Sequence, residues 1–485
     1  MVSSAPTEFT TQLYIDGKWS DAQRNLVDIN PATGQQITEF GAADAGDVHS
    51  AVQAARTAFD NHWSRSKPSV RVDLLNRIAD LCTRDAGVLA GLEALDIGKP
   101  LAQAAGLDVP MAIATFRHFA GWADKITGKT IPTDGYFGAD TLSYTVRHPI
   151  GVLGIIVPWN SPLMIAAWKI APALAAGNTI VVKPPEDAPL SLLHLARLID
   201  EAGVPPGVVN VVAGRGDIAG AALVAHPEVD KISFTGSTAV GTTIHREVSG
   251  SMKRLTLELG GKSPQIVLPD ADLDRALAGL SLGLFANQGQ VCAAGSRILA
   301  HRSVYAEVVD GLEAAGRAQI LGDPFDDATT MGPLINERQR KSVLRHVSGA
   351  VTEGARLVVG GTTPTLPGYY VEPTIIADAV NTMAIAREEV FGPVGCVIAF
   401  DTEEEAIAIA NDTEYGLAAT IWTQNLSTAH RVADGVRAGS VAVNGWSPLD
   451  PALPWGGVKA SGIGRELGLA GLHACTEEKV VTVVL

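Results

Sequence analysis

Short apolar segments alternate with helix-forming segments between about residue 150 and residue 260. Segments rich in β-branched residues cover 151–158, 179–183, 208–212, 231–234 and 255–259. Helix-forming segments lie between them at 164–176, 190–202, 218–225 and from 236 to about 247. Apolar strands that alternate with helices are typical of a parallel sheet covered on both faces. The pattern predicts an α/β fold with a doubly wound, Rossmann-type sheet, although a domain with this pattern need not bind a nucleotide.

A second α/β pattern follows the first. We expect helices at 271–288, 304–316, 337–353 and 403–411, and strands at 297–300, 397–400 and 439–443. Segment 130–148 is rich in β-forming and turn residues, and the chain ends on an apolar strand at 479–485 with no neighbour in the sequence. An isolated strand needs a sheet edge to join, and a partner subunit could provide one.

The composition limits the partners that we expect. With 485 residues, of which 46% are hydrophobic, the chain can bury several large cores. Its net charge of −15 is dispersed, so we expect neither a nucleic acid nor a membrane partner. No apolar run is long enough to span a bilayer, and the N-terminus has no signal-peptide pattern. The four cysteines form no CxxC pair and have no metal-like spacing, so we expect a cytoplasmic protein without a bound metal.

Three residues have the chemistry of a catalytic site. Cys292 lies in NQGQVCAAGS, where small residues leave room around the sulfur. A single cysteine in an apolar chain is more often a core residue, which is our interpretation of Cys82 and Cys396. Glu258 in LELGGKSP and Asn160 in VPWNSP each follow a predicted strand. Catalytic groups in open α/β sheets gather at the carboxyl ends of strands, although a loop glutamate and a turn asparagine are the simpler alternatives.

Two further segments have features of a nucleotide site. Lys183 and Glu186 in VVKPPED follow another strand. Lys183 can donate to hydroxyls or phosphates, and Glu186 can accept from ribose hydroxyls. The segment FTGSTAVG places Gly236 and Ser237 at a helix N-terminus, which favours a pyrophosphate. This segment is not a GxGxxG motif, and many βα turns contain glycine, so the signal is weak on its own.

Together these motifs resemble the aldehyde dehydrogenase superfamily over essentially the full length of the chain. The matching segments follow in the family's order: PWNSPL, KPPED, FTGSTAVG, LELGGKSP, GQVCAAGSR, EEVFGPV and PWGGVKASGIGRELG. Pro185 stands where the family usually has Ser or Ala. The resemblance implies a non-acylating, NAD(P)-dependent enzyme that forms a homodimer or homotetramer. It also implies an NAD-binding domain (1–125 and 149–259), a second α/β catalytic domain (260–471) and a small β oligomerisation arm (126–148 and 472–485).

The resemblance also assigns roles to residues. Cys292 would be the nucleophile, Glu258 the general base, and Asn160 with the backbone N–H of Cys292 the oxyanion hole. No metal is needed for this chemistry. The cofactor would be NAD, with NADP accepted more weakly because Glu186 would repel its phosphate. By the same resemblance the cofactor contacts would be Trp159, Lys183, Glu186, Gly236, Ser237, Leu259, Gly260, Gln339, Glu389 and Phe391.

The aldehyde itself is less constrained. By the resemblance, the residues that line the substrate funnel would be Met164, Trp168, Val291, Ala293, Leu449 and Trp455. None of these carries a positive charge, so we expect an apolar aldehyde, aromatic or medium-chain aliphatic, rather than a carboxylated semialdehyde. An acylating enzyme that uses coenzyme A is an alternative, and Glu258 argues against it. A cysteine hydrolase is a further alternative, but it would need a histidine beside the thiol, and none adjoins either catalytic motif. A binding protein that has lost catalysis is another, but it would not need Cys292, Glu258 and Asn160.

Overall fold

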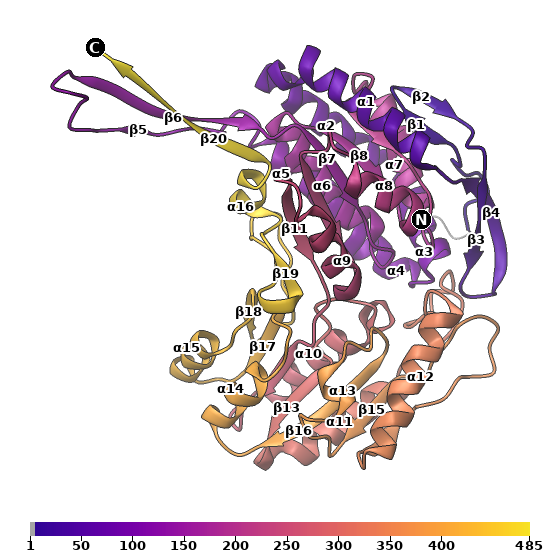
Figure 1. Cartoon of the computed structure of the whole chain (residues 1–485). Coiled ribbons are helices and arrows are strands. Elements are labelled where there is room, and N and C mark those ends of the chain that lie inside the picture. The colour runs from indigo at the N-terminus through magenta and orange to yellow at the C-terminus, as the bar shows by residue number, and fades with distance from the viewer. Residues whose placement is uncertain (1–4) are drawn as a thin grey trace.

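The computed structural model describes residues 5–485, and an eight-stranded sheet organises the first half of the chain (Figure 1). Its strand order is β19-β11-β10-β7-β8-β9-β1-β2. Five parallel strands form its centre: β7 (Val152–Ile156), β8 (Thr179–Lys183), β9 (Val209–Val211), β10 (Lys231–Thr235) and β11 (Arg254–Glu258). Antiparallel strands complete its edges: β1 (Leu13–Ile15), β2 (Lys18–Ser20) and β19 (Gly462–Ile463). The predicted doubly wound sheet is therefore confirmed.

Helices form layers around this sheet, and one of them is buried along its whole length. They are α1 (Ala45–Asn61), α2 (Pro68–Arg84), α3 (Ala86–Ile97), α4 (Leu101–Gln103), α5 (Val109–Ala120), α6 (Pro162–Ala176), α7 (Leu190–Glu201), α8 (Ala221–Ala225) and α9 (Thr238–Val248). Every residue of α6 is buried, including Lys169. A buried lysine needs partners, so its presence in an otherwise apolar helix points to a polar site nearby. The helix predicted at 218–225 begins earlier, as a π-helical turn over Gly216–Gly220.

A second, seven-stranded sheet organises most of the remaining chain. Its order is β14-β15-β16-β13-β12-β17-β18, and only β14 runs antiparallel to its neighbour. The strands are β12 (Pro264–Val267), β13 (Arg297–His301), β14 (Arg356–Val359), β15 (Thr374–Ala377), β16 (Val394–Phe400), β17 (Ala418–Trp422) and β18 (Ser440–Val443). The helices are α10 (Leu273–Phe285), α11 (Tyr305–Arg317), α12 (Glu337–Thr352), α13 (Ala384–Arg387), α14 (Glu403–Asn411) and α15 (Leu426–Gly435).

The helix predicted at 271–288 is too long. α10 ends at Phe285, because Asn287 and Gln288 adopt left-handed backbone conformations with φ of 48° and 56°. Such conformations are costly for residues other than glycine and are usually held by surrounding contacts. They turn the chain sharply just before Cys292.

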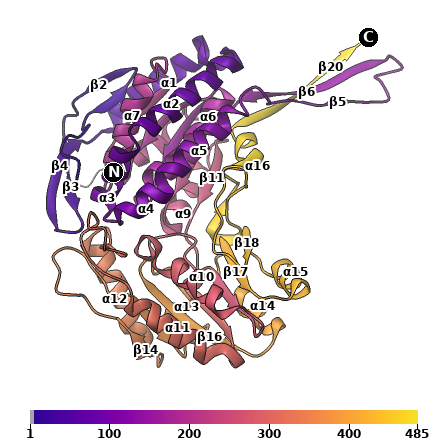
Figure 2. The same ribbon diagram turned by 180° about the vertical axis from the view of Figure 1, so that it is seen from behind.

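A β arm projects from the body, and the C-terminus lies at its far end (Figures 1 and 2). The last strand, β20 (Thr476–Val484), follows the short helix α16 (Gly468–His473) and pairs antiparallel with all of β6 (Thr141–Pro149). β5 (Thr130–Ile131) pairs with the other edge of β6. The terminal strand thus has its neighbour in the same chain, and a partner subunit is not needed to provide one. A separate hairpin, β3 (Asn25–Asn30) and β4 (Gln35–Gly41), lies near the N-terminus. Within residues 5–485, no helix is long and apolar enough to cross a membrane.

Candidate active site

Two cavities of similar size meet at Cys292. One measures about 440 Å³ and the other about 420 Å³, and both are lined by Asn160, Thr235 and Cys292. Asn160 follows β7, Thr235 ends β10, and Glu258, which lines the second cavity, ends β11. The cavities therefore lie at the carboxyl ends of the first sheet's parallel strands, where ligand sites of open α/β sheets are expected.

A network of amide groups holds the segment before Cys292. Asn160 Nδ2 donates to the carbonyl oxygen of Gln290 at 2.9 Å. Asn287 Nδ2 donates to the carbonyl oxygens of Asn160 at 2.8 Å and of Gln290 at 3.3 Å. Cys292 then lies in a turn closed by a bond of 2.9 Å from the N–H of Ala294 to the carbonyl oxygen of Val291. The sequence motifs around Asn160 and Cys292 are thus joined directly, through the left-handed turn that ends α10.

The environment of Cys292 favours the neutral thiol. Burial, together with the carboxyl groups of Glu389 and Glu258, raises the pKa of the Cys292 thiol to about 12. Burial also raises the pKa of Glu389 to about 7. Because the thiolate is the reactive form of cysteine, any reaction at this sulfur would first require the loss of the thiol proton.

Glu258 is buried without a hydrogen-bond partner. Its side chain is 4% exposed, and neither carboxyl oxygen is bonded to a group in the described part of the chain. Burial and the nearby Glu466 raise the pKa of Glu258 well above its usual value, while Lys169 and Arg465 oppose that rise. A carboxyl group of this kind can accept a proton near neutral pH, as a general base does.

The buried Lys169 connects to this carboxyl group through Glu466. The ammonium group of Lys169 on α6 donates to a carboxylate oxygen of Glu466 and to Ser233 Oγ, the latter at 3.1 Å. Ser233 Oγ also donates to Glu466 at 3.1 Å, and the second oxygen of Glu466 is unpartnered. Sequence analysis missed this pair. The only signal for it was a lysine inside the apolar helical segment 164–176.

The first cavity contains every residue predicted to contact the cofactor. They are Trp159, Lys183, Glu186, Gly236, Ser237, Leu259, Gly260, Gln339, Glu389 and Phe391. Several are held by backbone groups. Glu186 Oε2 accepts from the N–H of Gly216 at 2.8 Å, Glu389 Oε1 accepts from the N–H of Gly261 at 3.0 Å, and Gln339 Nε2 donates to the carbonyl oxygen of Phe391 at 2.8 Å. Burial lowers the pKa of Lys183 to about 8.

Three features of this cavity suit a dinucleotide. A Cβ at Gly260 would lie 2.3 Å from the carboxyl group of Glu389, so only glycine allows close approach there. The rings of Trp159 and Phe391 meet edge to face at 5.3 Å and form one wall. Ser237 caps the N-terminus of α9, whose first N–H groups favour an anionic group such as a pyrophosphate.

The second cavity contains every residue predicted to contact the substrate. They are Met164, Trp168, Val291, Ala293, Leu449 and Trp455. The rings of Trp168 and Trp455 lie 6.2 Å apart. Trp446, which the sequence did not single out, also lines the cavity, and its Nε1 donates to the carbonyl oxygen of Ala293 at 3.2 Å.

One positively charged residue lies in the wall of this cavity. Lys99 Nζ donates to Asp108 Oδ1 at 2.8 Å and to Ser161 Oγ at 3.1 Å, and both charged side chains are almost fully buried. Its charge is already matched by a carboxylate. The cavity therefore offers no free cation among the described residues that line it.

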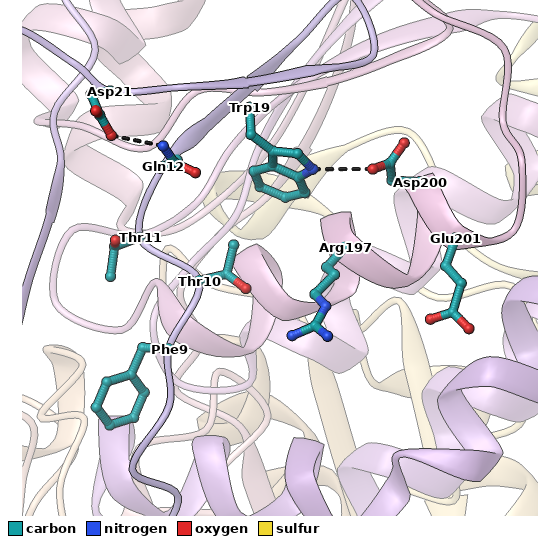
Figure 3. Close-up of a pocket in the computed structure, with 9 residues that line it drawn as sticks. All are labelled: Phe9, Thr10, Thr11, Gln12, Trp19, Asp21, Arg197, Asp200 and Glu201. Atoms are coloured by element: carbon teal, nitrogen blue, oxygen red, sulfur yellow. Dashed lines mark hydrogen bonds between the residues drawn. The ribbon is translucent and has the colours of Figure 1, made fainter.

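A shallower hollow lies elsewhere, between the N-terminal segment and α7 (Figure 3). Two pairs of its side chains are hydrogen-bonded: Trp19 Nε1 donates to Asp200 at 3.1 Å, and Gln12 Nε2 donates to Asp21 at 2.8 Å. No cysteine or histidine lines it. A thiol, a side-chain amide donor and a buried carboxyl group lie together at Cys292 instead.

Comparison with known proteins shows which proteins this chain is similar to. A family model described as the aldehyde dehydrogenase family matches residues 19–481. The chain is 46% identical to the mitochondrial aldehyde dehydrogenase of Sus scrofa, covering 100% of this chain and 95% of that protein. Among solved structures, the NAD+ complex of a Bacillus cereus aldehyde dehydrogenase is 44% identical with a TM-score of 0.96, covering 98% and 96% of the two chains. The indole-3-acetaldehyde dehydrogenase of P. syringae is 42% identical with a TM-score of 0.96, covering 99% and 97%.

Proposed function

The chain belongs to the aldehyde dehydrogenase family and oxidises aldehydes with NAD+, and from this premise we propose that Cys292 is its covalent nucleophile and a free carboxylic acid its product. One observation carries the proposal: Cys292 lies where the cavity suited to a dinucleotide meets the apolar cavity. A sulfur at this junction can hold the aldehyde carbon within reach of the cofactor.

In the first half of the reaction, the Cys292 thiol loses its proton to solvent, the thiolate attacks the aldehyde carbon, and the carbonyl oxygen becomes an oxyanion. Asn160 uses one amide N–H on Gln290, which fixes its orientation, and the second N–H can stabilise the oxyanion. The residues of the first cavity, among them Glu186 and Glu389, would hold NAD+, which when bound would accept the hydride that leaves the aldehyde carbon. Loss of this hydride leaves a thioester on Cys292.

In the second half, Glu258 accepts a proton from the water that attacks the thioester, and the acid leaves. Its unpaired carboxyl oxygens and raised pKa suit this role. A base on the wall of the substrate cavity favours hydrolysis over transfer to coenzyme A.

We propose an apolar aldehyde, aromatic or medium-chain aliphatic, as the substrate. The six predicted lining residues are apolar, and Lys99 is already paired with Asp108, which argues against a carboxylated semialdehyde. The similar P. syringae enzyme is named for an aromatic aldehyde, which fits a cavity with tryptophan walls.

We also propose a homodimer or homotetramer. The arm formed by β5, β6 and β20 exposes apolar side chains, among them Phe137 (94% exposed) and Val480 (63% exposed), which a second copy would cover. In this assignment 126–148 and 472–485 form the oligomerisation domain, 1–125 and 149–259 bind NAD, and 260–471 carry the nucleophile.

The four cysteines are unpaired, and a catalytic thiol must stay reduced, which supports the cytoplasm as the compartment of this protein.

The proposed chemistry is tested with benzaldehyde and hexanal, by following NADH with and without coenzyme A. Cys292→Ala should abolish turnover while NAD+ binding persists, whereas Cys82→Ala, at a buried core thiol, should remain active. Turnover above a few per cent in Cys292→Ala, or a strict need for coenzyme A, would contradict the proposal.

A further inference from the structure

The turn before Cys292 is held in a backbone conformation that its own residues do not favour. Asn287 and Gln288 have φ of 48° and 56°, and neither is glycine. Left-handed conformations of such residues persist only where the surrounding structure holds them. Because the turn leads directly into the segment of Cys292, the contacts that hold it also constrain the position of the sulfur.

One of these contacts comes from a side chain outside the motifs of the site. Gln103 is the last residue of the short helix α4 and precedes Asn287 by 184 residues. Its Oε1 accepts from the N–H of Asn287 at 2.9 Å, and its Nε2 donates to the carbonyl oxygen of Thr330 at 3.1 Å. The N–H of Leu101 on the same helix donates to the carbonyl oxygen of Pro324 at 2.9 Å. The helix is therefore anchored to the segment between α11 and α12 and presents Gln103 to the turn from a fixed base.

The turn is joined in both directions to the loop that carries Asn160. Asn287 Nδ2 donates to the carbonyl oxygen of Asn160 at 2.8 Å, and Asn160 Nδ2 donates to the carbonyl oxygen of Gln290 at 2.9 Å. A displacement of Asn287 would therefore move both the backbone and the amide acceptor of Asn160, and with them the direction of its second N–H. A chain of hydrogen bonds thus connects Gln103 to the amide that is placed to meet the oxyanion.

We propose that Gln103 is a positioning residue, which holds the left-handed turn so that Asn160 directs its free N–H at the oxyanion. This inference rests on the proposed function, since it requires attack by Cys292 and an oxyanion at Asn160. Gln103 also lines the second cavity, so a contact with the bound aldehyde is the alternative role. The two roles affect different constants: orientation of the oxyanion donor changes kcat, whereas a contact made equally in the ground state and the transition state changes KM.

The test compares Gln103→Met with Gln103→Glu in steady-state NADH formation. Methionine keeps the unbranched shape of the side chain but leaves the N–H of Asn287 without its acceptor, so kcat should fall about tenfold. The KM values for aldehyde and for NAD+ should change less than about threefold. Glutamate keeps an oxygen acceptor for Asn287, so kcat should stay within about threefold of wild type. Gln424→Met is the matched control, because Gln424 is exposed and its side chain forms no hydrogen bond within residues 5–485.

A double-mutant cycle decides whether Gln103 acts through Asn160. Once Asn160 is replaced by Ala there is no amide left to orient, so Gln103→Met should then cost less than about twofold in kcat.

Four outcomes would overturn the inference. They are a similar loss in both backgrounds, a raised KM with wild-type kcat in Gln103→Met, equal losses in the Met and Glu variants, and a Gln103→Met protein that no longer folds, since the role would then lie in stability. Wild-type activity of Asn160→Ala alone would instead overturn the proposed oxyanion site and this inference with it.

Discussion

The side-chain amide of Asn160 donates a hydrogen bond of 2.9 Å to the carbonyl oxygen of Gln290, two residues before Cys292. This bond ties the loop after β7 to the segment that carries the nucleophile. A primary amide has two N–H groups, so one can orient the side chain while the other meets a developing oxyanion. Such a donor stabilises charge without having to reorganise during the reaction.

Replacing Asn160 with Ala should lower kcat about 100- to 1,000-fold, the usual cost of losing one oxyanion donor. Asn160→Asp should lose a similar factor, because a carboxylate keeps the shape but cannot donate. The measurement is steady-state NADH formation, with NAD+ affinity followed separately to show that the cofactor cavity is intact. Activity of both variants within tenfold of wild type would remove Asn160 from the oxyanion site.

Replacing Glu258 with Gln should slow hydrolysis of the thioester more than the step before it. An amide cannot accept a proton from water, whereas attack by Cys292 does not require this carboxylate in the proposed sequence. Stopped-flow mixing should then show a burst of NADH close to one per active site, followed by turnover at least about 100-fold slower than wild type. A burst that is itself lost would mean that Glu258 acts earlier, on the thiol.

The pH dependence of turnover should respond to the charges around Glu258. Its pKa is raised by burial and by Glu466, so the basic form is lost as the pH falls through that raised pKa, and the rate falls with it. Glu466→Gln removes a negative neighbour, lowers the pKa of Glu258 and should shift the acid limb of the kcat profile to lower pH. Lys169→Met removes a positive neighbour and should shift it the opposite way. Shifts in the same direction would show that these residues act through packing instead.

Some features of the candidate site could be predicted from the sequence and others could not, and the structure explains the difference. Residues at strand ends, such as Lys183 and Glu258, were predictable because apolar β-branched segments mark parallel strands and their carboxyl ends share one edge. The left-handed turn at Asn287 could not be predicted, because tertiary contacts hold it against the local helical preference. The pairing of Lys169 with Glu466 joins α6 to a segment beyond β19, and no local pattern reports a contact over that separation.

Strands β12 and β17 were missed for a related reason. Both are short, and the buried segment PQIV of β12 follows the glycines of LELGGKSP with no alternation of polar and apolar residues. β12 is stabilised by pairing with β13 and β17, and β17 by pairing with β12 and β18, rather than by its own sequence. Trp446 was missed because it lies in a loop, and loops carry no periodic pattern from which a cavity wall can be predicted.

The preference between the two cofactors should depend on pH through Lys183. Burial lowers the pKa of Lys183 to about 8, so its ammonium group is present below pH 8 and is lost above it. This cation can attract the additional phosphate of NADP but gives no equal advantage to NAD. The ratio of kcat/KM for NAD+ to that for NADP+ should therefore increase between pH 7 and pH 9. A ratio that stays constant over this range would show that Lys183 does not contact the phosphate.

Which of the two cofactors is preferred should depend on Glu186, and we expect the wild-type protein to favour NAD+ over NADP+. Its Oε2 is held by the N–H of Gly216, so the carboxylate cannot easily turn away from a ribose placed beside it. It can accept hydrogen bonds from ribose hydroxyls but repels a phosphate, a difference of about 1–3 kcal/mol, or about 5- to 150-fold. Glu186→Gln keeps the length of the side chain and removes the charge, so it should improve NADP+ use relative to NAD+. The measurement is kcat/KM for each cofactor at saturating aldehyde. If wild type prefers NADP+, or if the ratio does not change in Glu186→Gln, this carboxylate does not select the cofactor.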